Sequence, residues 1–375
     1  MSYGTSSPSC EYDGETRYIR ITDINDNGEL NEDFVSPISY EEKHVLQDGD
    51  IVFARTGATV GKAYCYHSSN AKYVYAGYLI RLRPNKKIVL PDYIFYYTKS
   101  KNYLDFISAS QVAAAQPNVN AEKYSNLEIP VPPLEEQKRI VKILDEKFAQ
   151  LETIKTNAQT NLQNAKDLFQ SQLAKAFSNI SWEKKRLQDC TSIIGDGLHG
   201  TPKYNDDGDY YFINGNNLEK TVIEIKPETK RVDESQFQKY KVELNDKTVF
   251  VSINGTLGKT AFYNDEPVIL GKSACYANVK DCLNKYFLRY FYNSDEFLEY
   301  AYREATGATI KNLGLKAMRD LRIPLPPLPE QKRIVKELDT LSEKVRQLQE
   351  IYTKQIANCA ELKQSLLQKA FEGEL

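Results

Sequence analysis

The chain has 375 residues, 41 % of them hydrophobic, which is enough to build two or three domains with cores of their own. Its net charge is −2, so no overall excess of positive charge marks it as a nucleic-acid binder. It contains no run of 18 apolar residues, which excludes a membrane span, and its polar N-terminus does not resemble a signal peptide, so we expect a cytoplasmic protein.

Residues 1–128 form the first predicted domain, with 13 basic and 16 acidic side chains. Short apolar runs alternate with turns rich in Gly and Asn, which predicts β-strands, and residues 95–106 have the pattern of an amphipathic helix. The segment VFARTGATVGKAYCY (52–66) holds a Gly-Lys pair between two strand-like runs. We therefore expect an α+β domain.

Residues 129–180 form a predicted long helix that opens with the phrase IPVPPLEEQKRIVKILD (129–145). Proline suits the start of a helix and is costly inside one, and no proline follows Pro133 for dozens of residues. Apolar residues then recur at heptad spacing, which is typical of a coiled coil. The heptad positions are Ile140, Leu144, Lys147, Leu151, Ile154, Ala158, Asn161, Ala165 and Leu168.

Residues 181–322 form a second predicted domain, with 21 basic and 21 acidic side chains, and they repeat the first. The segment VFVSINGTLGKTAFY (249–263) aligns without a gap on residues 52–66 at an offset of 197. YFINGNNL (211–218) resembles YIRITDI (18–24), and Asn312 matches Asn118 just before a long helix. We therefore expect both domains to share one fold.

Residues 323–375 form a second predicted long helix, which opens with IPLPPLPEQKRIVKELD (323–339). This phrase is identical to the first at 14 of 17 positions, at a constant offset of 194. Each helix of about 40 residues would be about 60 Å long. Because the repeats are joined head to tail, the helices most simply lie antiparallel with pseudo-twofold symmetry. Two surface helices packed on separate domains are the alternative. The heptad positions are Ile334, Leu338, Leu341, Val345, Leu348, Tyr352, Gln355, Cys359, Leu362 and Leu366.

The segments GATVGKA (57–63) and GTLGKT (255–260) look like phosphate loops, but a P-loop has four residues between its two glycines. The spacing here is three in the first segment and two in the second. We favour β-hairpin tips, either purely structural or with amides and a lysine that touch DNA phosphate, over ATP binding.

Sequence signatures of catalysis and metal binding are weak. No Gly-rich loop follows a strand and opens a helix as in a nucleotide-binding unit. His44, His67 and His199 lie in polar contexts that do not suggest a Ser-His-Asp arrangement. The six cysteines form no C-x-x-C pair, so we expect neither a structural zinc site nor a disulfide framework. A self-contained methyltransferase or ATPase is therefore the weaker hypothesis.

The doubled phrase, the helix ends KAFSN (175–179) and KAFEGEL (369–375), and the loop GDGLHGTP (195–202) resemble the DNA-specificity subunit of type I restriction-modification systems. The resemblance covers essentially the full chain. It implies an α+β fold in which two target-recognition domains, each reading half of a split site in double-stranded DNA, are separated by two antiparallel helices.

The same resemblance implies a non-catalytic subunit that docks two methyltransferase subunits and restriction subunits. It implies no cofactor and no metal on this chain, because S-adenosylmethionine, ATP and Mg would belong to the partner subunits. The alternative function is a coiled-coil adaptor whose globular domains bind protein rather than DNA.

Polar side chains on the expected loops are the candidates for contact with DNA, since base reading needs fixed donors and acceptors. We expect Arg20 and Arg55 to read guanine, because each lies next to a strand-like run and we expect neither to be paired with an acidic residue at helical spacing. We expect Lys62 and Lys259 to bind phosphate. The predicted DNA-binding residues are Thr5, Ser6, Arg20, Thr22, Arg55, Thr56, Thr59, Lys62, His199, Thr201, Asn214, Asn216, Ser252, Asn254, Thr256 and Lys259. The predicted partner-binding residues are Glu136, Gln137, Arg139, Lys142, Glu330, Gln331, Arg333 and Lys336.

The first domain is expected to lack a segment at its edge. Residue Met1 aligns with Gly195, so SWEKKRLQDCTSII (181–194) has no counterpart in the first repeat. We expect either a chain truncated at its N-terminus or a first domain without this segment, and in both cases a less stable first domain.

Overall fold

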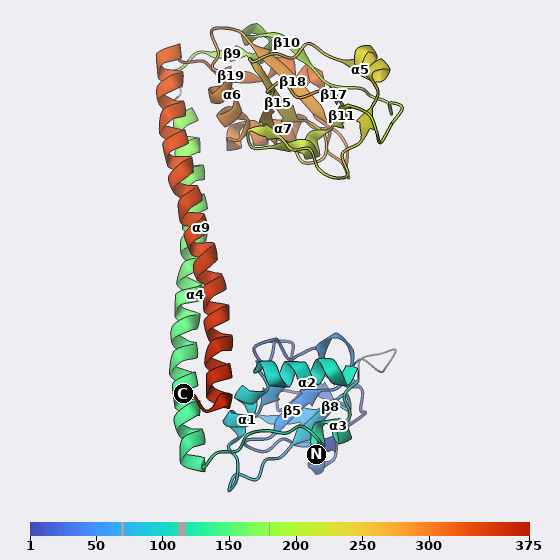
Figure 1. Ribbon diagram of the computed structural model, residues 1–375, viewed down its shortest axis with the longest axis vertical. Coiled ribbons are helices and arrows are strands. Elements are labelled where there is room, and N and C mark those ends of the chain that lie inside the picture. The colour runs from blue at the N-terminus through green and yellow to red at the C-terminus, as the bar shows by residue number, and fades with distance from the viewer. Residues whose placement is uncertain (69–70, 112–117, 180) are drawn as a thin grey trace. The chain divides into compact units, whose positions relative to one another are not determined.

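The computed structural model describes residues 1–68, 71–111, 118–179 and 181–375. These residues form two compact units, each of which combines a globular domain with parts of two long helices (Figure 1). Unit 1 comprises Met1–Gln159 and Tyr352–Leu375, and unit 2 comprises Thr160–Ile351. No helix in the described ranges is long and apolar enough to cross a membrane.

The globular domain of unit 1 is built on a four-stranded antiparallel sheet with the strand order β1-β8-β5-β6. The parallel pair of β3 and β7 packs against this sheet in a core that includes Ile19, Val52 and Tyr75. The strands are β1 (Ser2–Tyr3), β2 (Ser9–Glu11), β3 (Thr16–Ile19), β4 (Val35–Pro37), β5 (Ile51–Ala54), β6 (Ala63–Cys65), β7 (Lys72–Tyr75) and β8 (Leu79–Leu82). The helices are α1 (Pro91–Tyr97), α2 (Lys101–Gln111) and α3 (Ala121–Ser125), with short 3-10 turns η1 (Glu42–His44) and η2 (Gly57–Thr59).

The globular domain of unit 2 repeats this plan with the sheet β10-β18-β15-β16 and a parallel pair of β11 and β17. Its strands are β9 (Lys184–Arg186), β10 (Thr191–Gly195), β11 (Tyr210–Ile213), β12 (Leu218–Glu219), β13 (Val222–Ile223), β14 (Arg231–Val232), β15 (Thr248–Ser252), β16 (Thr260–Phe262), β17 (Val268–Leu270), β18 (Ala274–Val279) and β19 (Arg322–Pro324). Its helices are α5 (Glu234–Tyr240), α6 (Lys285–Tyr292), α7 (Asp295–Glu304) and α8 (Leu315–Asp320), with 3-10 turns η3 (Leu187–Cys190) and η4 (Gly215–Asn217).

The helices begin on residues that suit a helix N-terminus. In α6 the side chain of Asn284 accepts hydrogen bonds from the first backbone N–H groups, and in α7 the side chain of Ser294 does the same. Helix α1, the counterpart of α6, begins with Pro91, whose missing N–H costs nothing at that position.

The strand registers confirm that the two domains share one fold and correct the predicted alignment. In the hairpin β5–β6, Phe53 pairs with Ala63, whereas in β15–β16 Val251 pairs with Thr260. The offset is thus 198 before the tip and 197 after it, so the first tip carries one extra residue. The ungapped alignment of residues 52–66 was therefore wrong by one residue along β5.

The register of the first strand also differs by one residue from the sequence alignment. Val52 and its counterpart Phe250 pair with Arg81 and Tyr276. Arg81 pairs in turn with Ser2, and Tyr276 with Gly195, so Ser2 and not Met1 corresponds to Gly195. In unit 2 the chain before β10 adds strand β9, which pairs with β19. Within the described part of unit 1, no strand corresponds to this second pair.

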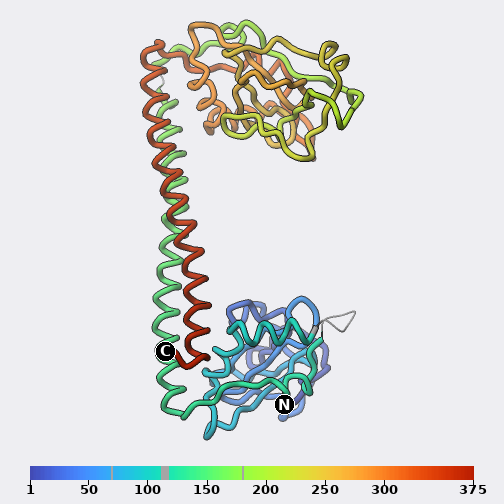
Figure 2. Tube along the Cα trace, in the orientation of Figure 1, coloured from blue at the N-terminus to red at the C-terminus, as the bar shows by residue number. Residues whose placement is uncertain are grey.

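Two long helices, α4 (Leu134–Phe177) and α9 (Leu328–Glu372), run antiparallel, as predicted (Figures 1 and 2). In unit 1, Leu144 near the start of α4 shares a core with Leu367 near the end of α9. In unit 2, the end of α4 packs in the same manner against the start of α9. The start of each long helix therefore packs against the globular domain that precedes it and against the end of the other long helix.

Burial along α4 follows the predicted seam only in part. Leu144, Ala158 and Ala165 are buried as the heptads predict, but Leu168 is exposed and Leu173 is buried instead. A straight α-helix has 3.6 residues per turn, so its buried face drifts away from a strict heptad toward the helix end. The packing of that end on the globular domain then decides which residue is covered.

Candidate functional site

Each globular domain presents a β-hairpin whose tip carries the Gly-Lys segment. Gly57 and Gly61 in unit 1, and Gly255 and Gly258 in unit 2, have positive φ angles between 72° and 88°, a region that favours glycine. Both tips join antiparallel strands, whereas a P-loop opens a helix. The prediction of hairpin tips is thus confirmed.

The lysine that follows each tip is paired with a carboxylate. Nζ of Lys62 lies 2.8 Å from Asp26, and Nζ of Lys259 lies 3.5 Å from Glu219. The acidic partners are exposed, and exposed ion pairs contribute little to stability, so a DNA phosphate can replace either carboxylate at small cost. Phosphate binding by both lysines stays a prediction.

Arg20 lies in the turn after β3 and is held by two carboxylates. Its Nε and Nη2 donate to Asp23 at 3.1 and 2.7 Å, and its Nη2 also donates to Asp33 at 2.6 Å. The hydrogen bonds to Asp23 raise the pKa of Arg20 above its usual range. The premise that Arg20 has no acidic partner was therefore wrong, and the residue can reach a base only by releasing a carboxylate.

The equivalent turn of unit 2 is built from asparagines. The N–H of Asn214 donates to Oδ1 of Asn217 at 3.0 Å, as the N–H of Arg20 donates to Oδ2 of Asp23 at 2.8 Å. Asn217 is buried, whereas Asn216 between them is exposed. The same backbone turn thus presents different side chains in the two units.

Arg55 lies at the base of the first tip between two tyrosine rings. Its guanidinium carbon is 4.9 Å from the ring centroid of Tyr3 and 5.8 Å from that of Tyr78. Its Nε is buried and has no hydrogen-bond partner among the described residues, which is uncommon for a charged donor. The N–H of Arg55 donates to the carbonyl of Tyr78, as that of Ile253 donates to Ser273, so isoleucine stands at this position in unit 2.

The asparagines that precede the long helices hold the tips. Asn118 forms a β-bridge with Thr56, and Asn312 forms one with Asn254. Nδ2 of Asn254 also donates to Oδ1 of Asn312 at 3.0 Å. The match between these asparagines in the sequence thus has a structural cause.

Two of the predicted DNA contacts are contradicted by burial. Thr5 is 9 % exposed and its Oγ1 accepts from the N–H of Ser7 at 3.2 Å. Ser252 is fully buried, and its Oγ donates to the carbonyl of Thr256 at 2.6 Å and accepts from the N–H of Lys259 at 2.9 Å. Both hydroxyls hold turns. The other predicted loop residues are at least partly exposed and stay candidates: Ser6, Thr22, Thr56, Thr59, His199, Thr201, Asn214, Asn216, Asn254 and Thr256.

A cavity of about 730 Å³ lies beside the first tip in unit 1, between the globular domain and the long helices. It is lined by Lys62, Lys99 and Lys363 together with acidic side chains. Burial, followed by the nearby charge of Lys363, lowers the pKa of Lys99 to about 8. The cavity thus has mixed charge.

The repeated phrase forms a joint between each globular domain and its long helix. Gln137 and Gln331 are both fully buried. Oε1 of Gln331 accepts from the N–H of Asn284 at 2.8 Å, and its Nε2 donates to the carbonyls of Cys282 and Pro326 at 2.9 and 2.8 Å. Gln137 makes the three matching bonds in unit 1. The prediction that these glutamines bind a partner protein was therefore wrong.

A tyrosine–aspartate pair, missed in the sequence, completes each joint. The hydroxyl of Tyr290 donates to Oδ1 of Asp339 at 2.6 Å, and that of Tyr96 donates to Asp145. Burial raises the pKa of both tyrosines above the usual range, so each stays a donor. The signal in the sequence was that an aspartate closes both copies of the phrase.

The other six predicted partner-binding residues lie exposed or half-buried on the outer faces of α4 and α9. Arg139 forms a bidentate pair with Glu136, and Arg333 forms one with Glu330. In unit 2, Glu330 and Arg333 also line a groove of about 420 Å³ that includes Trp182. The six residues are Glu136, Arg139, Lys142, Glu330, Arg333 and Lys336.

Comparisons with known proteins agree with this architecture. The family described as type I restriction modification DNA specificity domain matches residues 6–162 and again residues 179–356. The StySPI specificity subunit of Salmonella potsdam is 26 % identical over 91 % of this chain and 78 % of that protein. The EcoKI specificity subunit of Escherichia coli K12 is 24 % identical over the same shares of both chains.

Solved structures show the same fold. A chain from a study of complex assembly and conformational transition of the type I R-M system matches with a TM-score of 0.80 and 22 % identity, covering 100 % of this chain and 96 % of that one. The HsdS subunit from Thermoanaerobacter tengcongensis matches with a TM-score of 0.65 and 22 % identity, covering 100 % and 95 %. With both repeats matched by the family, the chain belongs to the type I restriction-modification DNA specificity family.

Proposed function

We propose that this chain is the non-catalytic DNA-recognition subunit of a type I restriction-modification complex. In this proposal each globular domain reads one half of a bipartite DNA site, and α4 and α9 set the gap between the halves. The observation that carries it is the duplication of one loop scaffold, a hairpin tip and an adjacent turn, with different side chains in each copy. Two copies of one backbone scaffold that carry different loop side chains can recognise two different half-sites.

The proposal also assigns partners. Two methyltransferase subunits dock on the exposed charged residues of the repeated phrase, one on each long helix, and restriction subunits join that core. S-adenosylmethionine, ATP and Mg belong to those partner subunits. Because partners can share the neutralisation of DNA phosphate, a net charge of −2 on this chain does not oppose DNA binding.

The test is to produce the chain with its methyltransferase partner and to sequence the methylated bases of the host DNA. We expect one motif with two half-sites and a fixed gap between them, and a complex whose gel shift requires that motif. Methylation without a sequence motif would contradict the proposal. Capture of a protein by the globular domains, with no DNA dependence, would favour an adaptor instead.

A further inference from the structure

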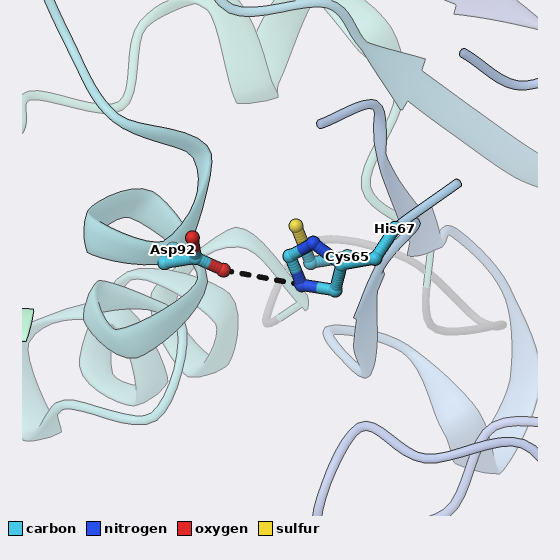
Figure 3. A group of neighbouring side chains, drawn as sticks. All are labelled: Cys65, His67 and Asp92. Atoms are coloured by element: carbon cyan, nitrogen blue, oxygen red, sulfur yellow. Dashed lines mark ion pairs between the residues drawn. The ribbon is translucent and has the colours of Figure 1, made fainter. Parts of the chain in front are cut away.

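Three potential metal ligands meet in unit 1 where β6 ends (Figure 3). Cys65 is the last residue of β6, His67 follows two residues later, and Asp92 is the second residue of α1. One ligand atom from each lies within 4.8 Å of the other two, and Nε2 of His67 is 3.2 Å from Oδ1 of Asp92. Within the described part of the chain this is the one group of three such residues.

The group has a buried side and an open side. Cys65 is only 5 % exposed, whereas the side chains of His67 and Asp92 are 62 % and 43 % exposed. Figure 3 shows the thiol of Cys65 and the carboxylate of Asp92 both next to the imidazole of His67. A cation can therefore enter from solvent and still meet the buried sulfur.

Unit 2 shows that the fold does not require polar residues at this junction. The strand register after the tip makes Phe262 the counterpart of Cys65. Tyr96 in α1 and Tyr290 in α6 make equivalent hydrogen bonds, so the counterpart of Asp92 is Tyr286. The rings of Phe262 and Tyr286 lie 4.9 Å apart. The junction that an aromatic pair closes in unit 2 is thus occupied by three ligands in unit 1.

We propose that Cys65, His67 and Asp92 bind one divalent cation of the zinc class, with water completing the coordination. Thiolate, imidazole and carboxylate are the ligands that zinc uses, and three protein ligands plus water form an open tetrahedral site. At metal–ligand distances of about 2.0–2.3 Å, the ligand atoms of such a site lie roughly 3.3–3.8 Å apart. The 3.2 Å between His67 and Asp92 is close to this range, and the sulfur of Cys65, within 4.8 Å of both, has to approach by at most about 1 Å.

Carboxylates around the group favour a cation. The carboxylate of Asp48 also acts on the thiol and the imidazole, and it is held by Lys86 at 2.7 Å. Burial, followed by the carboxylate of Asp92, raises the pKa of Cys65 to about 12.

A metal at this position would fasten β6, the second strand of the candidate DNA-reading hairpin, to α1. Helix α1 in turn holds the long helix through Tyr96 and Asp145. Because a cation that binds only the folded chain stabilises it by mass action, zinc is expected to raise the unfolding temperature of unit 1. The inference does not depend on DNA recognition by the same domain.

The experiment is metal analysis of the purified full chain, equilibrated with zinc alone and then freed of excess. We expect one zinc per chain, and with cobalt a charge-transfer absorption that reports a thiolate ligand. The variant His67→Asn introduces the residue that unit 2 carries at the equivalent position, Asn264. We expect it to weaken zinc binding at least about tenfold, because loss of a group that only supports a metal ligand already weakens binding that much. Competition with a chromophoric chelator measures the zinc affinity of the natural chain and of the variant.

Matched controls separate this site from incidental binding. His199→Asn removes an exposed histidine that also pairs with an aspartate, Asp196 at 2.7 Å, and Cys10→Ser removes an exposed thiol; both variants should keep the zinc. If Cys65→Ser proves unstable because the thiol is buried, the exposed His67 variant alone decides. Absence of bound zinc in the natural chain, or full binding by His67→Asn, would overturn the proposal.

Discussion

The side-chain amide of Gln331 is fully buried and donates from Nε2 to the carbonyl oxygen of Cys282 at 2.9 Å, across 49 residues of sequence. With its two other hydrogen bonds, this side chain joins the start of α9 to the loop before α6. The same arrangement recurs around Gln137. The recurrence of the phrase is thus explained in part by two identical joints within the chain.

The first prediction concerns this joint. Gln331→Leu leaves one buried N–H and two buried carbonyls without their partner, and each unsatisfied group costs about 1–3 kcal/mol. We expect the free energy of unfolding of unit 2 to fall by at least about 3 kcal/mol, measured by urea denaturation. Gln347→Leu, on an exposed face of the same helix, is the control and should change stability little. An equal loss of unfolding free energy in both variants would show that the hydrogen bonds of Gln331 contribute nothing to stability.

The long helices were predictable because proline at a helix start and heptad spacing are local signals that need no tertiary contact. The buried role of Gln331 was not, since it stands in the charged run PEQKR and its partners are backbone groups. Backbone groups have no signature in the side-chain sequence. An identical glutamine therefore looks like a surface residue until the fold is known.

The predicted alignment of the hairpins and the expectation that Arg20 is unpaired were wrong for other reasons. Val52 and Val249 align by identity in the sequence. The strand register instead makes Val52 the counterpart of Phe250, because one extra residue in the first tip shifts the strand by one position. A shift of one residue reverses which side chains face the core. For Arg20, the partner Asp23 stands only three residues away and was overlooked, whereas the second partner, Asp33, is thirteen residues away and is brought close only by the fold.

The second prediction concerns docking of the methyltransferase. Arg139→Glu combined with Arg333→Glu reverses the charge on both proposed docking faces and should weaken association while the chain stays folded. Native mass spectrometry of the complex measures it. Arg346→Glu is the matched control, because Arg346 is equally exposed on α9 and makes the same ion pairs with Glu343 and Glu350 outside the phrase. An unchanged stoichiometry in the double variant would refute this docking face.

The third prediction concerns the gap between half-sites. Four residues inserted after Gln159, with four more after Ile351 to keep the helices matched, add about one turn and about 6 Å to each helix. Since a base pair rises about 3.4 Å along one strand, the gap should change by one or two base pairs. Sequencing of methylated bases should show both half-sites unchanged. New half-sites with the old gap would contradict the role of the helices as spacers.

The fourth prediction separates phosphate binding from base reading. Lys259→Ala should weaken DNA binding equally for all sequences and lower the slope of log affinity against log salt by about one ion. Gel shifts of the complex at two or more salt concentrations measure it. Lys247→Ala removes a lysine with a similar carboxylate partner, Asp281, at the opposite end of β15, and should leave the slope unchanged. A changed motif in Lys259→Ala would assign this residue to base reading instead.

The fifth prediction concerns Arg55, one of three arginines whose buried Nε has no hydrogen-bond partner among the described residues. Arginine can hold two acceptors of guanine at once, whereas lysine keeps the charge but loses that fork. Arg55→Lys should therefore preserve the affinity for phosphate, cost about 1–3 kcal/mol of discrimination at one base, and relax one position of one half-site. Because Ile253 stands at the equivalent position of unit 2, the other half-site should not change.

Arg20→Lys is the comparison for Arg55→Lys. Its guanidinium is held by Asp23 and Asp33, so lysine should disturb the turn more than the reading of bases. The two variants are compared by the methylated motif and by affinity for sites mutated one base at a time. If Arg20→Lys relaxes the motif while Arg55→Lys leaves it intact, the guanidinium gives up its carboxylates to read DNA, and the tyrosine-flanked Arg55 has only a packing role between Tyr3 and Tyr78.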